Sequence, residues 1–185
     1  MRQIVLLAAL LAAAASAEDN GSHIASAEIV SSEEGYTLNA DFAFDLGPKL
    51  ADALDHGVSL HFVVELRIER PRWYWFDKVV VDRRLEYRLS YHAITRGYRL
   101  SAGSLHQSFG RLEEAVRTMQ HIRNWRVAPA GALAAGASHE VALRFRHDTT
   151  QLPKPFQISA VASGEWDVDT GWVEWTFLPG MTILP

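Results

Sequence analysis

Two stretches in the middle of the chain alternate apolar and polar residues with a period of two. Residues 58–68 read VSLHFVVELRI and residues 85–93 read LEYRLSYHA, so every second side chain is apolar in each. Alternation of this length is typical of a half-buried strand, because successive side chains of a strand point to opposite faces. The two stretches therefore predict a long antiparallel pair at the centre of a β-sandwich.

The charges on the polar sides of the two stretches predict how they pair. If both apolar sides face the core, one register places Glu65 opposite Arg84 and Arg67 opposite Asp82. Opposite charges that face each other directly contribute roughly a few tenths of a kcal/mol each and help to fix the register. The same register places His61 opposite Arg88.

The rest of the chain predicts further strands and two short helices. Strands are expected at residues 24–32, 36–44, 98–102, 104–109, 139–147 and 156–162, and in a final hairpin formed by 164–168 and 172–178. Helices are expected within residues 45–57, where Pro48 suits the first turn and Gly57 the position just past the end, and at 111–124. We therefore expect an all-β protein, an antiparallel β-sandwich in the immunoglobulin-like style with about eight to nine strands.

The first residues have the pattern of an export signal. Arg2 precedes an apolar run at residues 4–15 that is too short to span a bilayer, and Ala15-Ser16-Ala17 resembles a cleavage site. We expect residues 1–17 to be a cleaved signal peptide, residues 18–185 to form one domain, and the protein to be periplasmic without a membrane span. The chain has no cysteine, so its stability depends on packing and not on disulfides. Its net charge of −4 argues against a nucleic-acid binder.

Four consecutive aromatic residues, at positions 73–76, form the most conspicuous candidate binding site. In an extended chain Trp73 and Trp75 point to one side, beside Arg70 and Arg72. If exposed, the two indoles form a platform that stacks on sugars or on an apolar partner, with cation–π support from the arginines. The alternative, which the large buried area of aromatic residues favours, is that one pair belongs to the core.

Pro153 and Pro155 mark a second candidate site, at residues 152–156. Because proline has no amide hydrogen, this segment is expected at a sheet edge or in a polyproline stretch. Prolines at an edge discourage unwanted strand addition, which is the favoured interpretation. The alternative is that they dock a partner.

Motifs for catalysis and for metal binding are absent from the sequence. It has no G-x-S-x-G, no H-E-x-x-H and no cysteine, and its eight histidines lack the short spacings of metal ligands. Glu165, Asp167 and Asp169 alternate and could bind a cation or act as paired carboxylates on a sugar, but the solvated face of a hairpin is the favoured interpretation. Trp172 and Trp175 lie on opposite faces of the last strand, so one of them is expected to be exposed. We expect neither an enzyme nor a cofactor.

Several motifs of the chain resemble one family. They are the Arg72-Trp73-Tyr74-Trp75 run, the segment LSYHAITRGY at 89–98 and the segment TQLPKP at 150–155. By these motifs the chain is similar to a family of exported proteobacterial proteins that is known only as a domain of unknown function. The resemblance implies an export signal, one β-rich domain and no assigned activity. It also implies that members of the family are often encoded beside a membrane sensor kinase of the nitrogen-regulation type. This gene order implies an accessory role in the envelope.

The expected function is a non-catalytic binding or interaction module of the cell envelope. Its partner would be an envelope protein or peptide, bound through aromatic and edge-strand contacts. The alternative is a carbohydrate-type ligand binder that uses Trp73 and Trp75, and a hydrolytic enzyme has the least support. A flat apolar patch would indicate the first function and a concave pocket with converging polar groups the second. A histidine or carboxylate pair at hydrogen-bond distance in a cleft would indicate the third.

Overall fold

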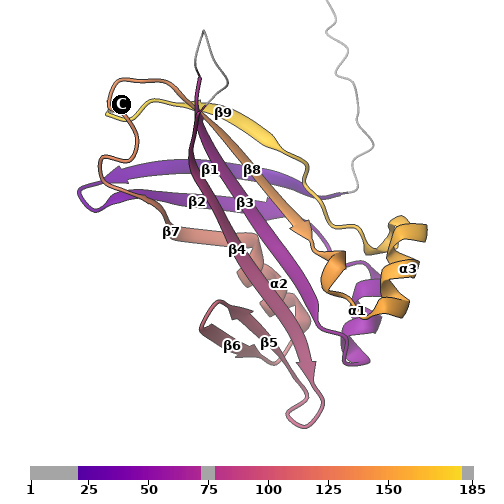
Figure 1. Cartoon of the computed structure of the whole chain (residues 1–185). Helices are drawn as coiled ribbons and strands as arrows, with labels where there is room; N and C mark the ends of the chain where they lie inside the picture. Colours follow the sequence, from indigo (N-terminus) through magenta and orange to yellow (C-terminus); the bar gives the residue numbers. More distant parts are fainter. Residues whose placement is uncertain (1–20, 72–77, 181–185) are drawn as a thin grey trace, which may run out of the picture.

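The computed structural model describes residues 21–71 and 78–180, and this part of the chain is mostly strand (Figure 1). Its strands are β1 (His23–Ser32), β2 (Gly35–Ala43), β3 (Leu60–Arg70), β4 (Lys78–His92), β5 (Gly97–Ala102), β6 (Leu105–Phe109), β7 (His121–Pro129), β8 (His139–His147) and β9 (Val173–Phe177). Its helices are α1 (Pro48–Asp55), α2 (Leu112–Gln120) and α3 (Lys154–Ala162), with 3₁₀ turns η1 (Thr149–Gln151) and η2 (Gly164–Trp166).

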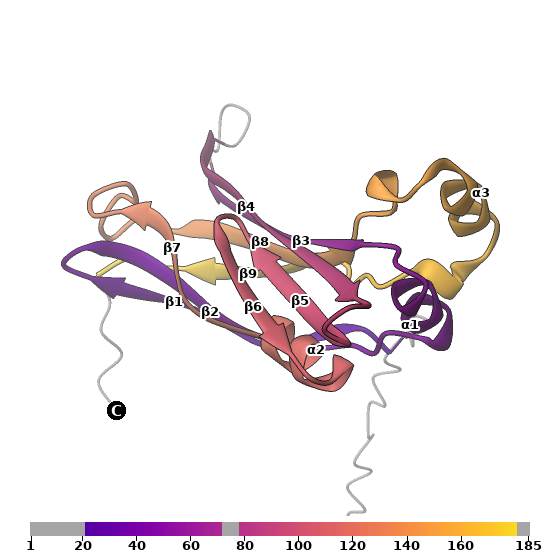
Figure 2. The same ribbon diagram turned by 90° about the horizontal axis from the view of Figure 1, so that it is seen from below.

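The strands form two antiparallel sheets, which confirms the predicted all-β sandwich. The smaller sheet has the order β1-β2-β7 and the larger one the order β6-β5-β4-β3-β8-β9. The smaller sheet lies across one face of the larger, as Figure 1 and Figure 2 show from two directions. Helices α1 and α3 lie beside each other at one end, and α2 packs against β2, β5, β6 and β7.

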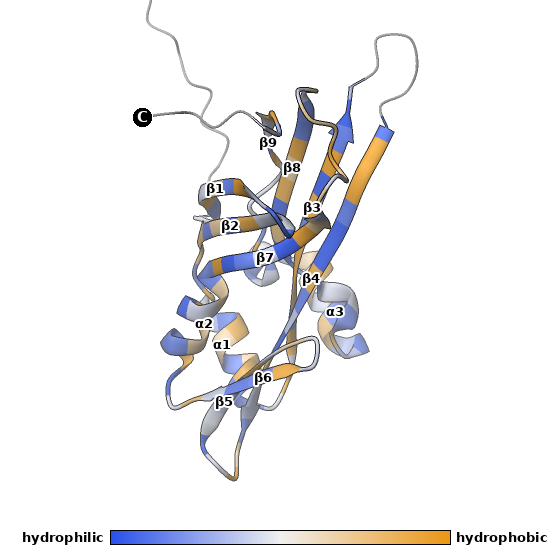
Figure 3. Ribbon diagram, turned by 90° about the vertical axis from the view of Figure 1, so that its left-hand side faces the viewer, coloured by the Kyte–Doolittle hydropathy of each residue, from blue (hydrophilic) through white to orange (hydrophobic). Residues whose placement is uncertain are grey.

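The central pair of the larger sheet has the predicted register. Glu65 lies opposite Arg84, Arg67 opposite Asp82, and His61 opposite Arg88. The register shifts by one residue between Ile68 and Glu69, near the end of β3. Figure 3 shows apolar and polar residues along both strands, which alternate throughout most of β3 and from Leu85 onward in β4, and the buried apolar ones belong to the core between the sheets.

Four phenylalanines join the two sheets. Phe145 of β8 lies 4.6 Å from Phe44, 5.2 Å from Phe42 and 5.7 Å from Phe62, measured between ring centroids. All four are buried, and Phe62 and Phe145 have no exposed surface. Because each ring buries a large apolar area, this cluster makes a main contribution to the stability of the sandwich.

Several residues with a positive φ lie where the chain turns between consecutive elements. Arg96 has φ +48° in the turn between β4 and β5, and Gly103 has φ +58° in the turn between β5 and β6. Gly57 has φ +87° just past the end of α1, which begins at Pro48 as expected. Glycine adopts such angles without the steric cost that a Cβ atom brings.

The second predicted helix is shorter than expected. The sequence predicts a helix at 111–124, but α2 ends at Gln120 and β7 begins at His121. Ile122 continues the apolar stripe of the helix in the sequence, yet it lies opposite Ala40 of β2. Backbone pairing with β2 over nine residues therefore outweighs the local helical pattern.

The prediction for residues 152–168 is wrong in two respects. The expected strand at 156–162 is the helix α3, and the expected strand at 164–168 contains the 3₁₀ turn η2. Pro153 is the N-cap of α3 and Pro155 lies in its first turn, where a missing amide hydrogen costs nothing. β9 pairs with β8 instead of forming a hairpin with 164–168.

Two predictions fall on residues outside the described part of the chain. They are the signal peptide at 1–17 and the platform of Trp73 and Trp75, together with Arg72. Within residues 21–71 and 78–180, none of the helices combines the length and the hydropathy that a bilayer crossing requires.

Candidate functional site

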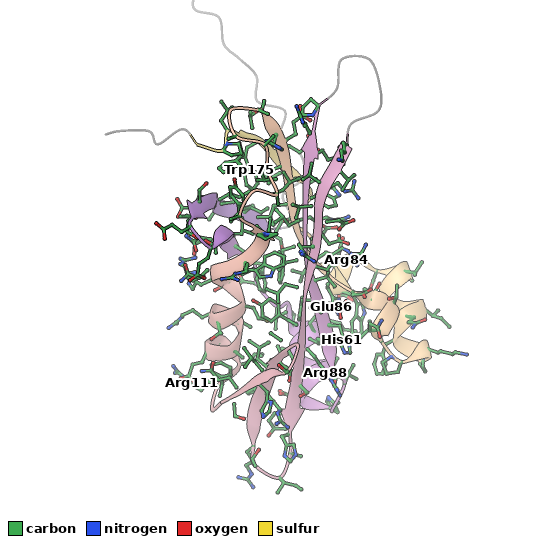
Figure 4. The ribbon with its side chains drawn as sticks, turned by 60° about the vertical axis from the view of Figure 1, so that its left-hand side comes forward. His61, Arg84, Glu86, Arg88, Arg111 and Trp175 are labelled. Carbon is green, nitrogen blue, oxygen red and sulfur yellow. The ribbon has the colours of Figure 1, made fainter. Side chains whose placement is uncertain are left out.

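The outer face of the larger sheet, which is turned away from the smaller sheet, carries charged residues on β3, β4 and β8. Its central strand β3 contributes Glu65, Arg67 and Glu69, which lie opposite Arg84, Asp82 and Val79 of β4 and opposite Arg144, Ala142 and Glu140 of β8. Figure 4 shows His61, Arg84, Glu86 and Arg88 along the same face. These side chains do not contribute to the core, so this face is available to bind a partner or a ligand.

Trp172 is an exposed aromatic residue on this face. It directly precedes β9, and 42% of its surface is accessible. The guanidinium carbons of Arg67 and Arg144 lie 5.8 and 5.9 Å from the centroid of its ring. These distances are within the range of cation–π attraction, so the two arginines hold the indole over the sheet.

A groove of about 310 Å³ lies beside Trp172. Its lining consists of charged, small and aromatic residues: Arg67, Glu69, Glu140, Val141, Ala142, Trp172 and Glu174. Glu69 lies directly opposite Glu140 across β3 and β8, and Arg67 is the cation nearest to Glu69, at 3.7 Å. Three carboxylates and one guanidinium give the lining a net charge of −2. Like charges that face each other repel, so a cationic group in the groove would relieve this repulsion.

Arg144 is fixed beneath Trp172 by Asp169. Its Nε donates to Oδ1 of Asp169 at 2.8 Å, and a second guanidinium N–H donates to Oδ2. Burial alone would raise the pKa of Asp169, but the hydrogen bonds from Arg144 and from the Gly171 amide lower it. The hydrogen bond to Asp169 in turn raises the pKa of Arg144. This bidentate pair keeps both groups charged and orients the arginine under the indole.

An ion-pair network separates the groove from the other end of the face. Glu65 accepts a hydrogen bond of 3.1 Å from Nε of Arg146 and lies 3.6 Å from Arg84. Arg146 also lies 3.6 Å from Asp148. Hydrogen bonding to Glu65 raises the pKa of Arg146, so this arginine remains charged. The network ties β3, β4 and β8 together across the face.

A second hollow of about 210 Å³ surrounds His61 at this other end. Glu86, Asp148 and Gln151 are among the residues that line it. Burial and the charge of Arg88 lower the pKa of His61, against the opposing charges of Asp148 and Glu86. In the described part of the chain, no cluster of three or more metal-ligating side chains is found here or elsewhere.

One histidine–carboxylate pair occurs on the smaller sheet. His121 Nδ1 lies 2.7 Å from Oδ1 of Asp41, beside a hollow of about 390 Å³. Ser26 donates its hydroxyl proton to Asp41 at 2.7 Å, and Arg123 also binds Asp41. These hydrogen bonds, from Ser26 first and then from His121 and Arg123, hold the pKa of Asp41 well below its usual range. Because the serine bonds the carboxylate and not the imidazole, this arrangement lacks an activated nucleophile.

Of the residues predicted as a site, only Arg70, Pro153 and Pro155 lie in the described part of the chain. Arg70 is exposed at the end of β3, and Pro153 and Pro155 are exposed at the start of α3. The three predicted carboxylates separate: Asp169 pairs with Arg144, while Glu165 lies in η2. The edge-strand interpretation of the prolines is wrong, because they begin a helix.

The prediction for the last two tryptophans is confirmed. Trp172 is exposed on the outer face, and Trp175 packs against the core. The residues around Trp172 were missed, because Arg67, Glu140 and Arg144 approach it only through the pairing of β3 with β8. The alternation of Glu140, Ala142, Arg144 and Arg146 with apolar residues predicts that they share one face, but no local signal predicts their partner strand.

The fold and this face define an all-β protein of two antiparallel sheets, with a polar, tryptophan-bordered groove on the larger sheet. The chain belongs to the family described as a domain of unknown function, DUF4390, whose model matches residues 19–176. This confirms the resemblance inferred from its motifs. Neither the curated proteins nor the solved structures include a match to this chain.

Proposed function

We propose that the protein is a non-catalytic binding module, exported to the periplasm, and that the groove beside Trp172 receives its partner. The observation that carries this proposal is the exposed indole held over Arg67 and Arg144 at the border of a concave groove. An exposed aromatic side chain beside converging polar groups is typical of recognition sites. The export signal at residues 1–17 supports the periplasmic location.

The charge of the groove favours a partner with a basic side chain. Glu140 and Glu174 border the groove together with Glu69, and the guanidinium of Arg67 offsets only one of the three carboxylates. A lysine or arginine of an envelope protein or peptide would neutralise this surplus, while its neighbouring residues stack on Trp172. We further propose that this partner belongs to a membrane sensor system, the setting that the family resemblance implies.

A carbohydrate is the second candidate ligand. The groove is concave and its polar groups converge beside an indole, whereas a flat apolar patch would favour a protein partner alone. Carboxylates and guanidinium groups hydrogen-bond sugar hydroxyls, and a sugar ring stacks on an indole. In this candidate site Trp172 takes the stacking role that the sequence predicts for Trp73 and Trp75.

Catalysis receives little support from the described residues. The pair of His121 and Asp41 is the closest approach to a catalytic arrangement, and there Ser26 donates to the carboxylate. His61 has two carboxylates in its hollow, but the residues that line it include no serine, threonine or cysteine for the histidine to activate. We therefore propose binding without chemistry.

The proposal is tested by comparing two variants in the groove beside Trp172 with a control variant at an exposed position outside it. We expect Trp172→Ala to reduce recovery of a specific partner from envelope extracts about tenfold or more, since central aromatic residues dominate binding energy. Ile94→Ala, at a 90% exposed position in the turn after β4, should leave recovery unchanged. Glu140→Gln should weaken binding of a basic partner and reduce its dependence on salt.

Titration with defined ligands separates the two candidates. A lysine-containing peptide derived from the recovered partner should bind the wild type and lose affinity with Glu140→Gln. N-acetylglucosamine oligomers should quench tryptophan fluorescence if the carbohydrate proposal is correct. Equal recovery and equal titration curves for a folded Trp172→Ala variant would contradict both candidates.

A further inference from the structure

Strand β9 is an open edge of the larger sheet. Its residues pair with β8, from Leu143 opposite Val173 to His139 opposite Phe177, and among the described residues no strand lies on its other side. Figure 1 shows β9 at this margin of the sheet. A free edge presents unpaired N–H and C=O groups, which form a template for another strand.

This edge lacks the usual protection against strand addition. β9 has no lysine, no proline and no register shift, and its charge is a single glutamate, Glu174. Three large apolar side chains are exposed within or directly beside it: Trp172 at 42%, Val173 at 39% and Leu178 at 37%. Native proteins blunt free edges with charges, prolines or bulges, so an unguarded apolar edge points to an interface.

The other edges differ from β9. β1 has one large exposed apolar residue, Val30, and its pairing is interrupted between Ile24 and Ser26. On β7, Nε of Arg83 donates to the backbone oxygen of Val127 at 3.1 Å and occupies part of the edge. β6 has one large exposed apolar residue, Leu105. The concentration of exposed apolar surface thus singles out β9.

We propose that β9 pairs with β9 of a second copy of this chain, antiparallel and centred on Trp175. In this register Glu174 lies opposite Thr176 of the second copy, and Val173 lies opposite Phe177. Just outside the strand, Trp172 lies opposite Leu178. Each exposed apolar side chain then meets an apolar one, and the two glutamates do not face each other. An interface that pairs one patch with itself is the isologous contact of a two-fold dimer.

Neighbouring registers are less favourable. If the pairing is centred on Glu174, this residue faces its own copy, and two like charges lie opposite each other. If it is centred on Thr176, Glu174 faces the apolar Leu178. A shift of one residue joins the outer face of one copy to the core face of the other. The sequence of β9 is therefore self-complementary in one register.

This pairing leaves the groove beside Trp172 accessible. The groove opens on the outer face of the sheet and is lined by β3, β8 and the side chains of Trp172 and Glu174, whereas the pairing uses the backbone edge of β9. The two copies would form one continuous sheet with both grooves on the same face. A partner with two basic segments would then engage both grooves.

Sedimentation equilibrium on the purified protein tests the dimer. We expect Thr176→Glu to weaken association about tenfold or more, because it places a glutamate opposite Glu174 twice in each dimer. Thr176→Lys should preserve or tighten association about threefold, because it creates two opposite-charge pairs. Ser108→Glu, on the exposed edge strand β6, is the matched control and should have no effect.

Cysteine cross-linking tests the register, and the chain has no native cysteine to interfere. A mixture of Glu174→Cys and Thr176→Cys proteins should form a mixed disulfide dimer on mild oxidation, while each variant alone should form far less. A monomeric wild type at about 100 µM, well above typical specific dimer affinities, would overturn the proposal. So would a dimer that is insensitive to Thr176→Glu, since another surface must then hold it together.

Discussion

Glu65 of β3 faces Arg84 of β4, with 3.6 Å between Oε1 of the glutamate and Nη2 of the arginine. The same carboxylate accepts a hydrogen bond from Arg146 of β8, so one acidic side chain links three strands of the larger sheet. Glu65 is largely buried, at 12% side-chain exposure, while Arg84 is 62% exposed. The two members of the pair are therefore expected to contribute unequally to stability.

Glu65→Ala should lower the free energy of unfolding by about 1–3 kcal/mol, because Arg146 loses a charged hydrogen-bond partner in a half-buried site. Arg84→Ala should cost less than about 1 kcal/mol, as is usual for an exposed ion pair. Urea denaturation of both variants measures the difference. Equal losses would show that the pairing with Arg84, and not the link to Arg146, carries the interaction.

Phe145→Ala should cost about 3–5 kcal/mol, because it opens a cavity between the two sheets. The ring of Phe145 contacts those of Phe42, Phe44 and Phe62, and it has no exposed surface. Val30→Ala, at a 41% exposed position, is the control and should cost less than about 1 kcal/mol. Thermal or urea unfolding checks both values. Similar small losses for the two variants would contradict the packing of the sheets on this cluster.

Gly35→Ala should destabilise the protein by about 2–4 kcal/mol, because the alanine would have both an unfavourable backbone φ and a steric clash of its Cβ atom. Gly35 has φ +132°, and a Cβ atom there would press on the Ala128 carbonyl oxygen and lie 2.9 Å from the Ala130 nitrogen. Gly110→Ala, where a Cβ atom meets no neighbour within 4 Å, should change stability by less than about 0.5 kcal/mol. A tolerated Gly35→Ala would mean that the close approach of β2 to the end of β7 is relaxed in solution.

Acid should weaken the fold through His147. Burial lowers the pKa of this histidine below its ordinary value of 6.5, so the folded state favours the neutral ring. Above about pH 6.5 both folded and unfolded forms are neutral. Below it only the unfolded chain takes up the proton, so the free energy of unfolding falls by at most about 1.4 kcal/mol per pH unit until the folded pKa is reached. His61, whose pKa burial also lowers, adds to the effect.

Denaturation at about pH 7.5 and about pH 5.5 should show this loss in the wild type and a smaller loss in His147→Gln. The variant also lacks the hydrogen bond between Nδ1 and the Trp166 carbonyl oxygen, so the comparison uses the change with pH and not the absolute stability. His56→Gln is the control, since hydrogen bonding to Asp52 raises the pKa of this exposed histidine. An identical pH dependence in wild type and His147→Gln would exclude His147 as the cause.

Part of the fold follows from local patterns. The register of β3 and β4 could be predicted because two long alternations and their charges both constrain it, and the ends of α1 could be predicted from Pro48 and Gly57. The end of α2 could not be predicted, because Ile122 fits the apolar stripe of a helix as well as it fits a strand. Pro153 and Pro155 were similarly ambiguous, since proline is compatible with a sheet edge and with the first turn of a helix.

Residue spacing along one strand or two consecutive strands is enough to predict the all-β class, the central strand pair with its register, and the opposite faces of Trp172 and Trp175. The pairing of β8 with β3 follows from the folded chain alone, and with it the position of Arg67, Arg144 and Glu140 around Trp172. The physical reason is that strand partners far apart in sequence are chosen by the burial of whole faces, which no short segment encodes alone.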